Sequence, residues 1–385
     1  MRKLLLLFLL ATSALTAQDG IQFRDGTLAE LMQFSKNENK PLMLMCYAEW
    51  CPHCKKMKSE VVIQPEVAAF FNDNFVCASK DMEKGDGKTI RRKLRIKSYP
   101  TFVFISPDGT LIYQVAKGLK ADDFIQEGKN ALDVTKQFPT LRKAFFADPT
   151  NAENCLTYIQ ALKKGNIDVE SVALKYFSTV REDQLVSEIN WRIFANGISN
   201  INTREFQHVL KNQEMYAAVS SPNRVERKIL HAVRETLSSS AESGDTLNYN
   251  KARPAIAAIQ LQKTDSLLFN YDLKVYELAN DWKRYKETAL EGTAKFAWDN
   301  ANTLRDITLN FSKNIDDEAA LTQSIKWAER SLELKTAYDI HLILAHLNLK
   351  AGKKESARDW AEKGKAMAVQ NDWDPIRADE ILNQI

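Results

Sequence analysis

Two cysteines three positions apart, Cys51 and Cys54, are the residues of this sequence best suited to chemistry. At the start of a helix, this spacing places their Cα atoms ~5–6 Å apart, a separation that a disulfide spans without strain. The pair can therefore open and close while the fold stays unchanged. Pro52 and His53 lie between the cysteines and are poor choices for a disulfide that only cross-links the chain. The spacing therefore predicts a redox-active disulfide.

The pair is expected to divide into a nucleophile and a resolving thiol. Cys51 comes first, where free backbone N–H groups and the helix dipole favour an anion. An ordinary thiol, with a pKa of ~8.5, is only a few per cent thiolate at pH 7, and lowering this pKa by about three units takes ~4 kcal/mol. The dipole supplies at most ~2 kcal/mol, so hydrogen bonds to Cys51 must supply the rest, and His53 is the obvious side-chain donor. We expect an exposed nucleophilic Cys51 and a resolving Cys54.

A zinc site is an alternative use of these side chains. Structural zinc normally needs four ligands, usually from two separated pairs, whereas Cys51, His53 and Cys54 supply three. The sequence has no second C-x-x-C motif. The remaining histidines all lie in the C-terminal part of the chain: His208, His231, His341 and His346. The sequence therefore predicts neither a metal nor another cofactor.

The elements that must position the pair fall within residues 20–135. A capping box at Thr27-Leu28-Ala29-Glu30 opens the first helix, which runs to about Lys36. The side chains expected to face inward from this helix are Leu28, Leu31, Met32 and Phe34. Apolar runs predict strands at 42–48, 75–78, 101–105 and 111–115, and helices are expected at 51–62, from Pro65 onward and at 121–132. This order predicts an α/β open sheet with helices on both faces.

Residues 139–385 differ in character, because strand-like runs disappear and apolar residues recur every three or four positions. About ten to twelve helices would fill this all-α region. A second capping box at Thr150-Asn151-Ala152-Glu153 and a cap at Ser221-Pro222 predict two helix starts. The serine- and glycine-rich stretch 238–245 predicts a loop or a joint between subdomains. In the tail, small residues that recur at a spacing of about 33 positions resemble tetratricopeptide repeats. The alternative is an irregular helical domain.

Two segments of the first domain resemble the active site of the thioredoxin superfamily. They are Tyr47-Ala48-Glu49-Trp50-Cys51-x-x-Cys54-Lys55 and Ser98-Tyr99-Pro100-Thr101. The resemblance implies a thioredoxin-like fold over about a third of the chain and the activity of a thiol:disulfide oxidoreductase. It implies that Pro100 is cis and faces the cysteines, so that the catalytic set is Cys51, Cys54, His53 and Pro100. A substrate strand is then expected to bind across Trp50, Pro52, Tyr99 and Thr101.

Two positions depart from the family pattern. Many thioredoxins keep a buried aspartate six residues before the first active-site cysteine and a lysine on the next strand, where this sequence has Met45 and Cys77. The usual proton acceptor for the resolving thiol is therefore missing, and Glu49 or solvent would replace it. Cys77 is interpreted as a buried core thiol, and Cys46 is expected on the opposite side of its strand from Met45. The Pro-His dipeptide resembles that of strongly oxidising members, but the redox direction stays open.

The first residues predict export. A basic start, an apolar run at 4–10 and a small residue at Ala17 are typical of a signal peptide covering residues 1–17. The apolar run is shorter than the ~20 residues that a membrane span needs, and the sequence contains no longer one. We expect a periplasmic protein whose partners are cysteine-containing envelope proteins and a protein that recharges the disulfide. The net charge of +3 is too small to indicate nucleic acid as the main partner.

Six basic residues between Lys88 and Lys97 permit two interpretations. They form either a solvated helix face or a positive field near Pro100 that attracts acidic substrates. A rival function for the whole chain is an interaction protein, in which the helical region binds an envelope partner and the redox domain is vestigial or only senses oxidation. The complete set of Cys51, Cys54 and Pro100 favours the enzyme.

Overall fold

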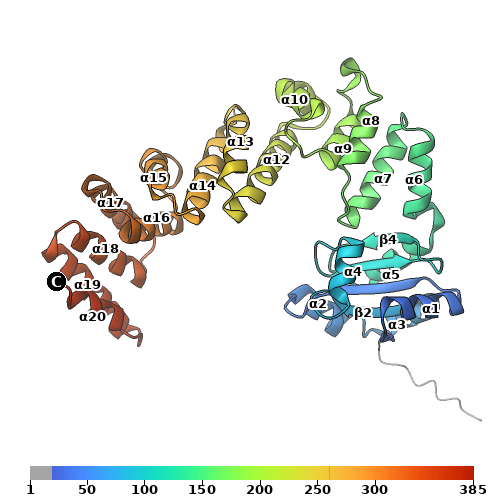
Figure 1. The fold of residues 1–385 in the computed structure, drawn as a ribbon, viewed down its shortest axis with the longest axis horizontal. Coiled ribbons are helices and arrows are strands. Elements are labelled where there is room, and N and C mark those ends of the chain that lie inside the picture. Colours follow the sequence, from blue (N-terminus) through green and yellow to red (C-terminus); the bar gives the residue numbers. More distant parts are fainter. Residues whose placement is uncertain (1–19, 260) are drawn as a thin grey trace, which may run out of the picture. The chain divides into compact units, whose positions relative to one another are not determined.

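The computed structural model describes residues 20–259 and 261–385 (Figure 1). The predicted signal peptide, residues 1–17, lies outside the described residues. The chain forms two compact units: the first runs to Ile198 and takes in 203–221, and the second consists of 199–202 and 222–385. None of the helices within the described ranges is both long and apolar enough to cross a membrane.

A four-stranded sheet holds the first unit together. Its strands are β1 (Leu42–Tyr47), β2 (Val76–Asp81), β3 (Thr101–Ile105) and β4 (Leu111–Val115), in the order β2-β1-β3-β4. Strand β1 pairs parallel with β2 and antiparallel with β3, and β3 pairs antiparallel with β4. All five residues from Leu42 to Cys46 are buried, which a central strand covered on both faces requires. The predicted strands are confirmed.

Helices cover both faces of this sheet. The elements on one face are α1 (Leu28–Glu38) and α4 (Gly87–Leu94); those on the other are α2 (Pro52–Lys56), the π-helix η1 (Met57–Val61), α3 (Pro65–Asn74) and α5 (Ala121–Leu132). Because side chains alternate along a strand, Leu44 packs with α1 and α4, whereas Met45 packs with α3 and α5. The rings of Phe71 and Phe124 stack at 4.1 Å between α3 and α5. The predicted α/β architecture is confirmed.

The first helix shows one error in the predicted core. Its capping box is present, with the Glu30 backbone N–H donating to the Thr27 hydroxyl and the Glu30 carboxylate accepting from the Thr27 backbone. Phe34, however, is exposed, and its ring lies 5.1 Å below the Arg24 guanidinium. Ser35 is buried instead, because it lies four residues after Leu31 on the face that meets the sheet.

Residues beyond Phe138 are helical, as predicted. The helices are α6 (Phe138–Ala147), α7 (Ala152–Lys164), α8 (Glu170–Phe177), α9 (Glu188–Gly197), α10 (Arg204–Lys211), α11 (Gln213–Ala218), α12 (Pro222–Ser243), α13 (Thr246–Ala257), α14 (Gln262–Leu278), α15 (Trp282–Phe296), α16 (Ala301–Asn314), α17 (Glu318–Leu334), α18 (Tyr338–Lys350), α19 (Lys354–Gln370) and α20 (Ile376–Leu382). They exceed the number predicted, because short turns divide the apolar pattern more often than expected. Pro222 begins α12, as the Ser221-Pro222 signal predicts.

Two predicted boundaries in this region are wrong. Asn151, not Thr150, caps α7, and its side-chain oxygen accepts the Asn154 backbone N–H at 3.0 Å. The stretch 238–245 is mostly helix, because α12 continues to Ser243 with Ala241 buried against its neighbours. The turn itself is short: Gly244 has a φ of +66° and is followed by Asp245, which caps α13.

Small residues bring the tail helices close together. Ala361 and Gly364 are buried on α19, and a Cβ at Gly364 would lie 3.3 Å from the His341 Cβ on α18. On α17, Ser324 and Ala328 are likewise buried. Consecutive helices therefore pack against one another as hairpins from α16 to α20.

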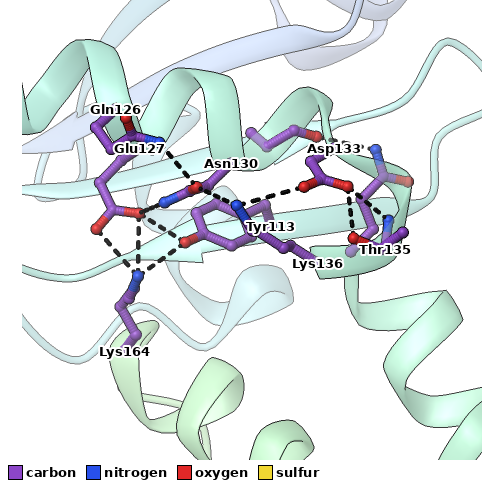
Figure 2. Close-up of polar contacts among 10 residues, drawn as sticks. Tyr113, Gln126, Glu127, Asn130, Asp133, Thr135, Lys136 and Lys164 are labelled. Carbon is purple, nitrogen blue, oxygen red and sulfur yellow. Dashed lines mark hydrogen bonds and ion pairs between the residues drawn. The ribbon is translucent and has the colours of Figure 1, made fainter.

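The first helical hairpin packs on the sheet domain within the first unit. The Lys164 ammonium, at the end of α7, lies 3.1 Å from both carboxylate oxygens of Glu127 on α5 and 3.0 Å from the Tyr113 hydroxyl on β4 (Figure 2). The Tyr113 hydroxyl donates to Glu127 at 2.6 Å, and the Asn130 amide donates to the same carboxylate at 3.0 Å. A partly buried polar network thus joins β4, α5 and α7.

Backbone contacts continue this junction toward the loop that precedes β3. The Ala116 N–H donates to the Lys164 carbonyl oxygen at 3.0 Å, and the Gln114 amide donates to the Gly165 carbonyl oxygen at 2.6 Å. The next residue, Asn166, donates from its side chain to the Ser98 hydroxyl oxygen at 3.2 Å. The turn after α7 is therefore fixed against β4 and reaches the loop that contains Pro100.

Candidate active site

Cys51 occupies the position immediately before the first residue of α2. Its backbone is extended, and its sulfur accepts a hydrogen bond from the Cys54 backbone N–H at 3.2 Å. Pro52 is the first helical residue, where its missing N–H leaves no hydrogen bond unmade. The sulfur of Cys51 therefore caps the helix, in the place where an anion is favoured.

The two active-site sulfurs are adjacent and enclosed. They lie 2.6 Å apart, with the Cys54 thiol donating to Cys51. Cys51 is 3% exposed and Cys54 is 1% exposed. The expectation of an exposed Cys51 is therefore wrong, because Ala48 and the Tyr99 side chain pack against the pair.

The loop before β3 faces the sulfur pair. The Tyr99–Pro100 peptide bond is cis, as the family resemblance implies. The Cys51 thiol lies 3.6 Å from the Tyr99 carbonyl oxygen and donates to it. Thr101, which was expected at the substrate surface, is 1% exposed, and its hydroxyl donates to the Ser98 carbonyl oxygen at 2.7 Å. Its side chain therefore stabilises the loop before β3 from the protein interior.

Trp50 forms the outer rim of the site and is 64% exposed. Its indole N–H donates to the Glu83 carboxylate at 2.7 Å, and its ring meets the Tyr99 ring edge-on with centroids 6.0 Å apart. The Arg91 guanidinium lies 3.8 Å from the other Glu83 oxygen and 5.8 Å from the Tyr99 ring centroid. Sequence reasoning missed Glu83, since only its position just after β2 hints that it lies near the site.

His53 points to a cavity rather than to the nucleophile. It is exposed on α2 and lines a cavity of about 570 Å³ together with Met57, Tyr99 and Lys117. Within the described ranges, the hydrogen-bond partners of the Cys51 sulfur are groups of Cys54 and Tyr99, and His53 is not among them. The Cys54 backbone and thiol thus occupy the donor role that was expected of His53.

Among the residues that the structure describes, none supplies a buried base to the resolving thiol. Burial, together with the hydrogen bond to Cys51, raises the pKa of Cys54 to about 12. Met45 and Cys77 are buried in the core beside α3 and α5, as expected from the departure at these positions. Glu49 is exposed, and its carboxylate lies 2.5 Å from the Lys84 ammonium. Among the described residues, no carboxylate is hydrogen-bonded to Cys54.

The remaining cysteines are separated from the active site. Cys46 packs in the core under α1 and α4, whereas Met45 and Cys77 pack in the core on the other face of the sheet, so the predicted placement of Cys46 opposite Met45 is confirmed. Cys155 is buried on α7. Burial raises the pKa of Cys77 and of Cys155 to about 12. Over the described residues, no group of three or more histidine, cysteine or acidic side chains could hold a metal ion.

Comparisons with known proteins concern the sheet domain. Residues 28–132 match the model of the thioredoxin-like domain family. The sequence is 27% identical over 104 residues to protein disulfide-isomerase A5 of Mus musculus, and 28% identical over 116 residues to the chloroplastic thioredoxin Y of Oryza sativa subsp. japonica. A solution structure described as a candidate disulphide-isomerase from Bacteroides thetaiotaomicron has 33% identity and a TM-score of 0.28, covering 30% of this chain and 95% of that one.

The likeness has a limited extent. The aligned part is 27% of this chain and only 20% of the mouse disulfide-isomerase; it is 30% of this chain and 66% of the rice thioredoxin. Helices α6 to α20 lie outside the residues that the family model matches. The sheet order, the cysteine pair at the start of α2 and the cis-proline loop all belong to the matched part. Residues 28–132 of this chain are a thioredoxin-like domain, followed by a long run of helices.

Proposed function

We propose that this protein is a thiol–disulfide oxidoreductase that exchanges electrons between Cys51 and Cys54 and the cysteines of other proteins. The observation that supports it most is the placement of two sulfurs 2.6 Å apart beside the Tyr99 carbonyl oxygen. The Tyr99 carbonyl oxygen lies 3.6 Å from the Cys51 sulfur, where an extended client segment can pair with the backbone. Trp50 and Tyr99 supply apolar walls on one side of this position.

The exchange proceeds through a mixed disulfide. In the reducing direction, the Cys51 thiolate attacks one sulfur of a client disulfide, the client S–S bond breaks, and the other client sulfur leaves as a thiolate. Cys54 then gives its proton to solvent and attacks the Cys51 sulfur, which releases the client and forms the Cys51–Cys54 disulfide. The client gains two electrons and the cysteine pair loses two. Oxidation of a client dithiol is the same sequence reversed.

A second dithiol or disulfide protein must return the pair to its starting state. Pro52 and His53 between the cysteines favour an oxidising or isomerising tendency, because this dipeptide resembles that of oxidising family members. His53 and Lys117 line the same cavity, where a charged group of this second protein can approach. Measuring the reduction potential of the purified protein decides the direction: a potential near ~−270 mV indicates a reductase, and one near ~−120 mV an oxidase.

We further propose that the protein works in the periplasm on cysteine-containing envelope proteins. The support is the basic and apolar pattern of residues 1–17. Mass spectrometry of the exported protein should give an N-terminus at Gln18, and cell fractionation should find it outside the cytoplasm. An intact Met1 in a cytoplasmic fraction contradicts this part of the proposal.

Substrate trapping tests the activity itself. A Cys54→Ala variant keeps the nucleophile but cannot release a client, so it should accumulate mixed disulfides that dithiothreitol dissolves. The matched control, Cys51→Ala with Cys54→Ala, should accumulate none. The oxidoreductase proposal fails if the single variant also traps nothing and the wild-type pair does not react with glutathione. The function would then lie in the helical region, as in an interaction protein with a vestigial redox domain.

A further inference from the structure

Helix α4, beside the active site, carries positive charge that the ion pairs of the described residues leave mostly unneutralised. The exposed basic side chains on α4 and in the loop that follows it are Lys88, Arg91, Arg92, Lys93, Arg95 and Lys97. Across the described residues, only Arg91 of this set has an acidic partner, Glu83, at 3.8 Å. The dipole of a helix balances about half a charge at its C-terminus, so most of this charge faces solvent.

Three of these cations surround a cavity. Lys88, Arg91 and Arg92 line a space of about 490 Å³ together with Met82 and Glu83. Met82 is 0% exposed and therefore forms an apolar floor, while the cationic groups form the rim. An acidic side chain fits such a space, because its methylene groups can contact the floor while its carboxylate meets the cations.

Glu83 connects this cavity to the active-site rim. One of its carboxylate oxygens accepts the Trp50 indole N–H at 2.7 Å, and the other lies 3.8 Å from Arg91. Arg91 in turn lies over the Tyr99 ring, and the Tyr99 carbonyl oxygen contacts the Cys51 sulfur. A carboxylate that enters the cavity therefore competes with Glu83 for Arg91, at a point that adjoins the residues around the nucleophile.

We propose that the cavity lined by Lys88, Arg91 and Arg92 binds an acidic side chain of the client segment that carries the reacting cysteine, and so selects acidic clients. This inference rests on the proposed oxidoreductase function and names the class of client. The attraction acts before the chemical step, because a positive surface raises the local concentration of an acidic segment and aligns it with the Pro100 loop.

Two disulfide-bonded peptides test the inference, identical except that one carries glutamates and the other glutamines beside the cysteines. The protein should process the glutamate peptide with a kcat/KM about tenfold higher at low ionic strength, mostly through a lower KM. Raising the salt to about 0.5 M should remove most of this preference, because the screening length falls to a few ångströms.

Substitutions on α4 test whether its cationic side chains cause the preference for the acidic peptide. In Lys88→Gln with Arg92→Gln, the ratio of kcat/KM for the acidic over the neutral peptide should fall to about one. The matched control, Lys36→Gln with Lys129→Gln, removes the same charge from exposed positions on α1 and α5 and should keep the wild-type ratio.

The outcomes separate the two proposals. Equal rates for the two peptides in the wild-type protein, or a preference that survives the α4 substitutions, overturn the acidic-client inference while the oxidoreductase function stands. If neither peptide reacts while a small-molecule dithiol also leaves the pair unchanged, the oxidoreductase function itself fails.

Discussion

The Lys164 ammonium contacts both oxygens of the Glu127 carboxylate, at 3.1 Å each, and so connects α7 to α5. Burial alone would raise the pKa of Glu127, but hydrogen bonds from Tyr113, Asn130 and Lys164 outweigh it and hold this pKa below its ordinary value. The carboxylate is therefore ionised at neutral pH, and the first helical hairpin is attached to the sheet domain by a charged group that is largely enclosed.

Replacing Lys164 by methionine should loosen this attachment. The free energy of unfolding should fall by about 1–2 kcal/mol at pH 7, less than for a fully buried pair because the Lys164 side chain is 38% exposed. A lowered carboxyl pKa stabilises the fold only above the pKa of the unfolded chain, so the difference from the wild type should shrink as the pH falls from about 5 to 3. Urea unfolding followed by circular dichroism measures both effects, with Lys129→Met as the control. A difference that does not change with pH contradicts the role given to Glu127.

Alkylation should distinguish Cys51 from the other four cysteines. Burial raises the pKa of Cys54, Cys77 and Cys155 to about 12, and that of Cys46 well above its ordinary value. Iodoacetamide at pH 7.5 should therefore add one group to the native, reduced protein, whereas denatured protein should accept a group on each of its five cysteines. Peptide mass mapping should place the native adduct on Cys51. Early modification of Cys54 would contradict this prediction.

Alkaline pH should destabilise the first unit through its structural thiols. The pKa of Cys77 and of Cys155 is about 12 in the folded protein, whereas an unfolded thiol ionises near ~8.5. Above pH 9 the unfolded chain has lost a proton that the folded chain keeps, so stability falls as the pH rises, by up to about 1.4 kcal/mol per unit for each thiol. Below about pH 8 both thiols are protonated in the folded and the unfolded chain, so their full contribution to stability is present.

Urea midpoints at pH 8, 9 and 10, measured in a reductant, test this slope. Cys155→Ala should be less stable at pH 8 because it leaves a cavity, yet its stability should decline less steeply as the pH rises. If stability changes with pH equally steeply in the variant and the wild type, the Cys155 thiol has the same pKa in the folded and unfolded states.

Gly87 should tolerate no side chain. A Cβ at this position would lie 1.9 Å from the Asp81 backbone oxygen, so α4 could keep a larger residue only by moving away from the end of β2. Gly87→Ala should therefore cost ~2 kcal/mol or more of stability and should also weaken the preference for acidic peptides, because α4 carries their cavity. Lys88→Ala, one residue further along, has an exposed side chain and should leave the stability within about 0.5 kcal/mol. Thermal unfolding of both variants provides the comparison.

The sheet domain could be predicted well from the sequence because its signals are local. The Ser106-Pro107-Asp108-Gly109 turn separates two apolar runs, and β3 and β4 have the predicted bounds. Helix α5 likewise spans the predicted 121–132. The two active-site segments were predictable since each is a short contiguous motif, and the fold then brings Tyr99 beside Cys51.

The errors and omissions arise where contacts are distant in sequence. Ser35 lies four residues after Leu31, but the larger apolar side chain of Phe34 was the stronger core candidate, and only the packing of α1 on the sheet shows which of the two is buried. The Trp50–Glu83 hydrogen bond joins residues 33 positions apart, and the Lys164–Glu127 pair joins residues 37 positions apart, so neither has a local signature. One error is local instead: the backbone N–H of Cys54, three positions after Cys51, takes the donor role that was expected of the His53 side chain.

The fixed turn after α7 limits what the cysteines can reach. The Gly165 carbonyl oxygen is held by Gln114, and the Asn166 amide is held by Ser98, one residue before Tyr99. A domain on a flexible linker can reorient toward a recessed target, but the sheet domain cannot move independently of α7. If the pair exchanges with client disulfides as proposed, disulfides in mobile loops, tails or unfolded chains should therefore react faster than disulfides held in a rigid surface.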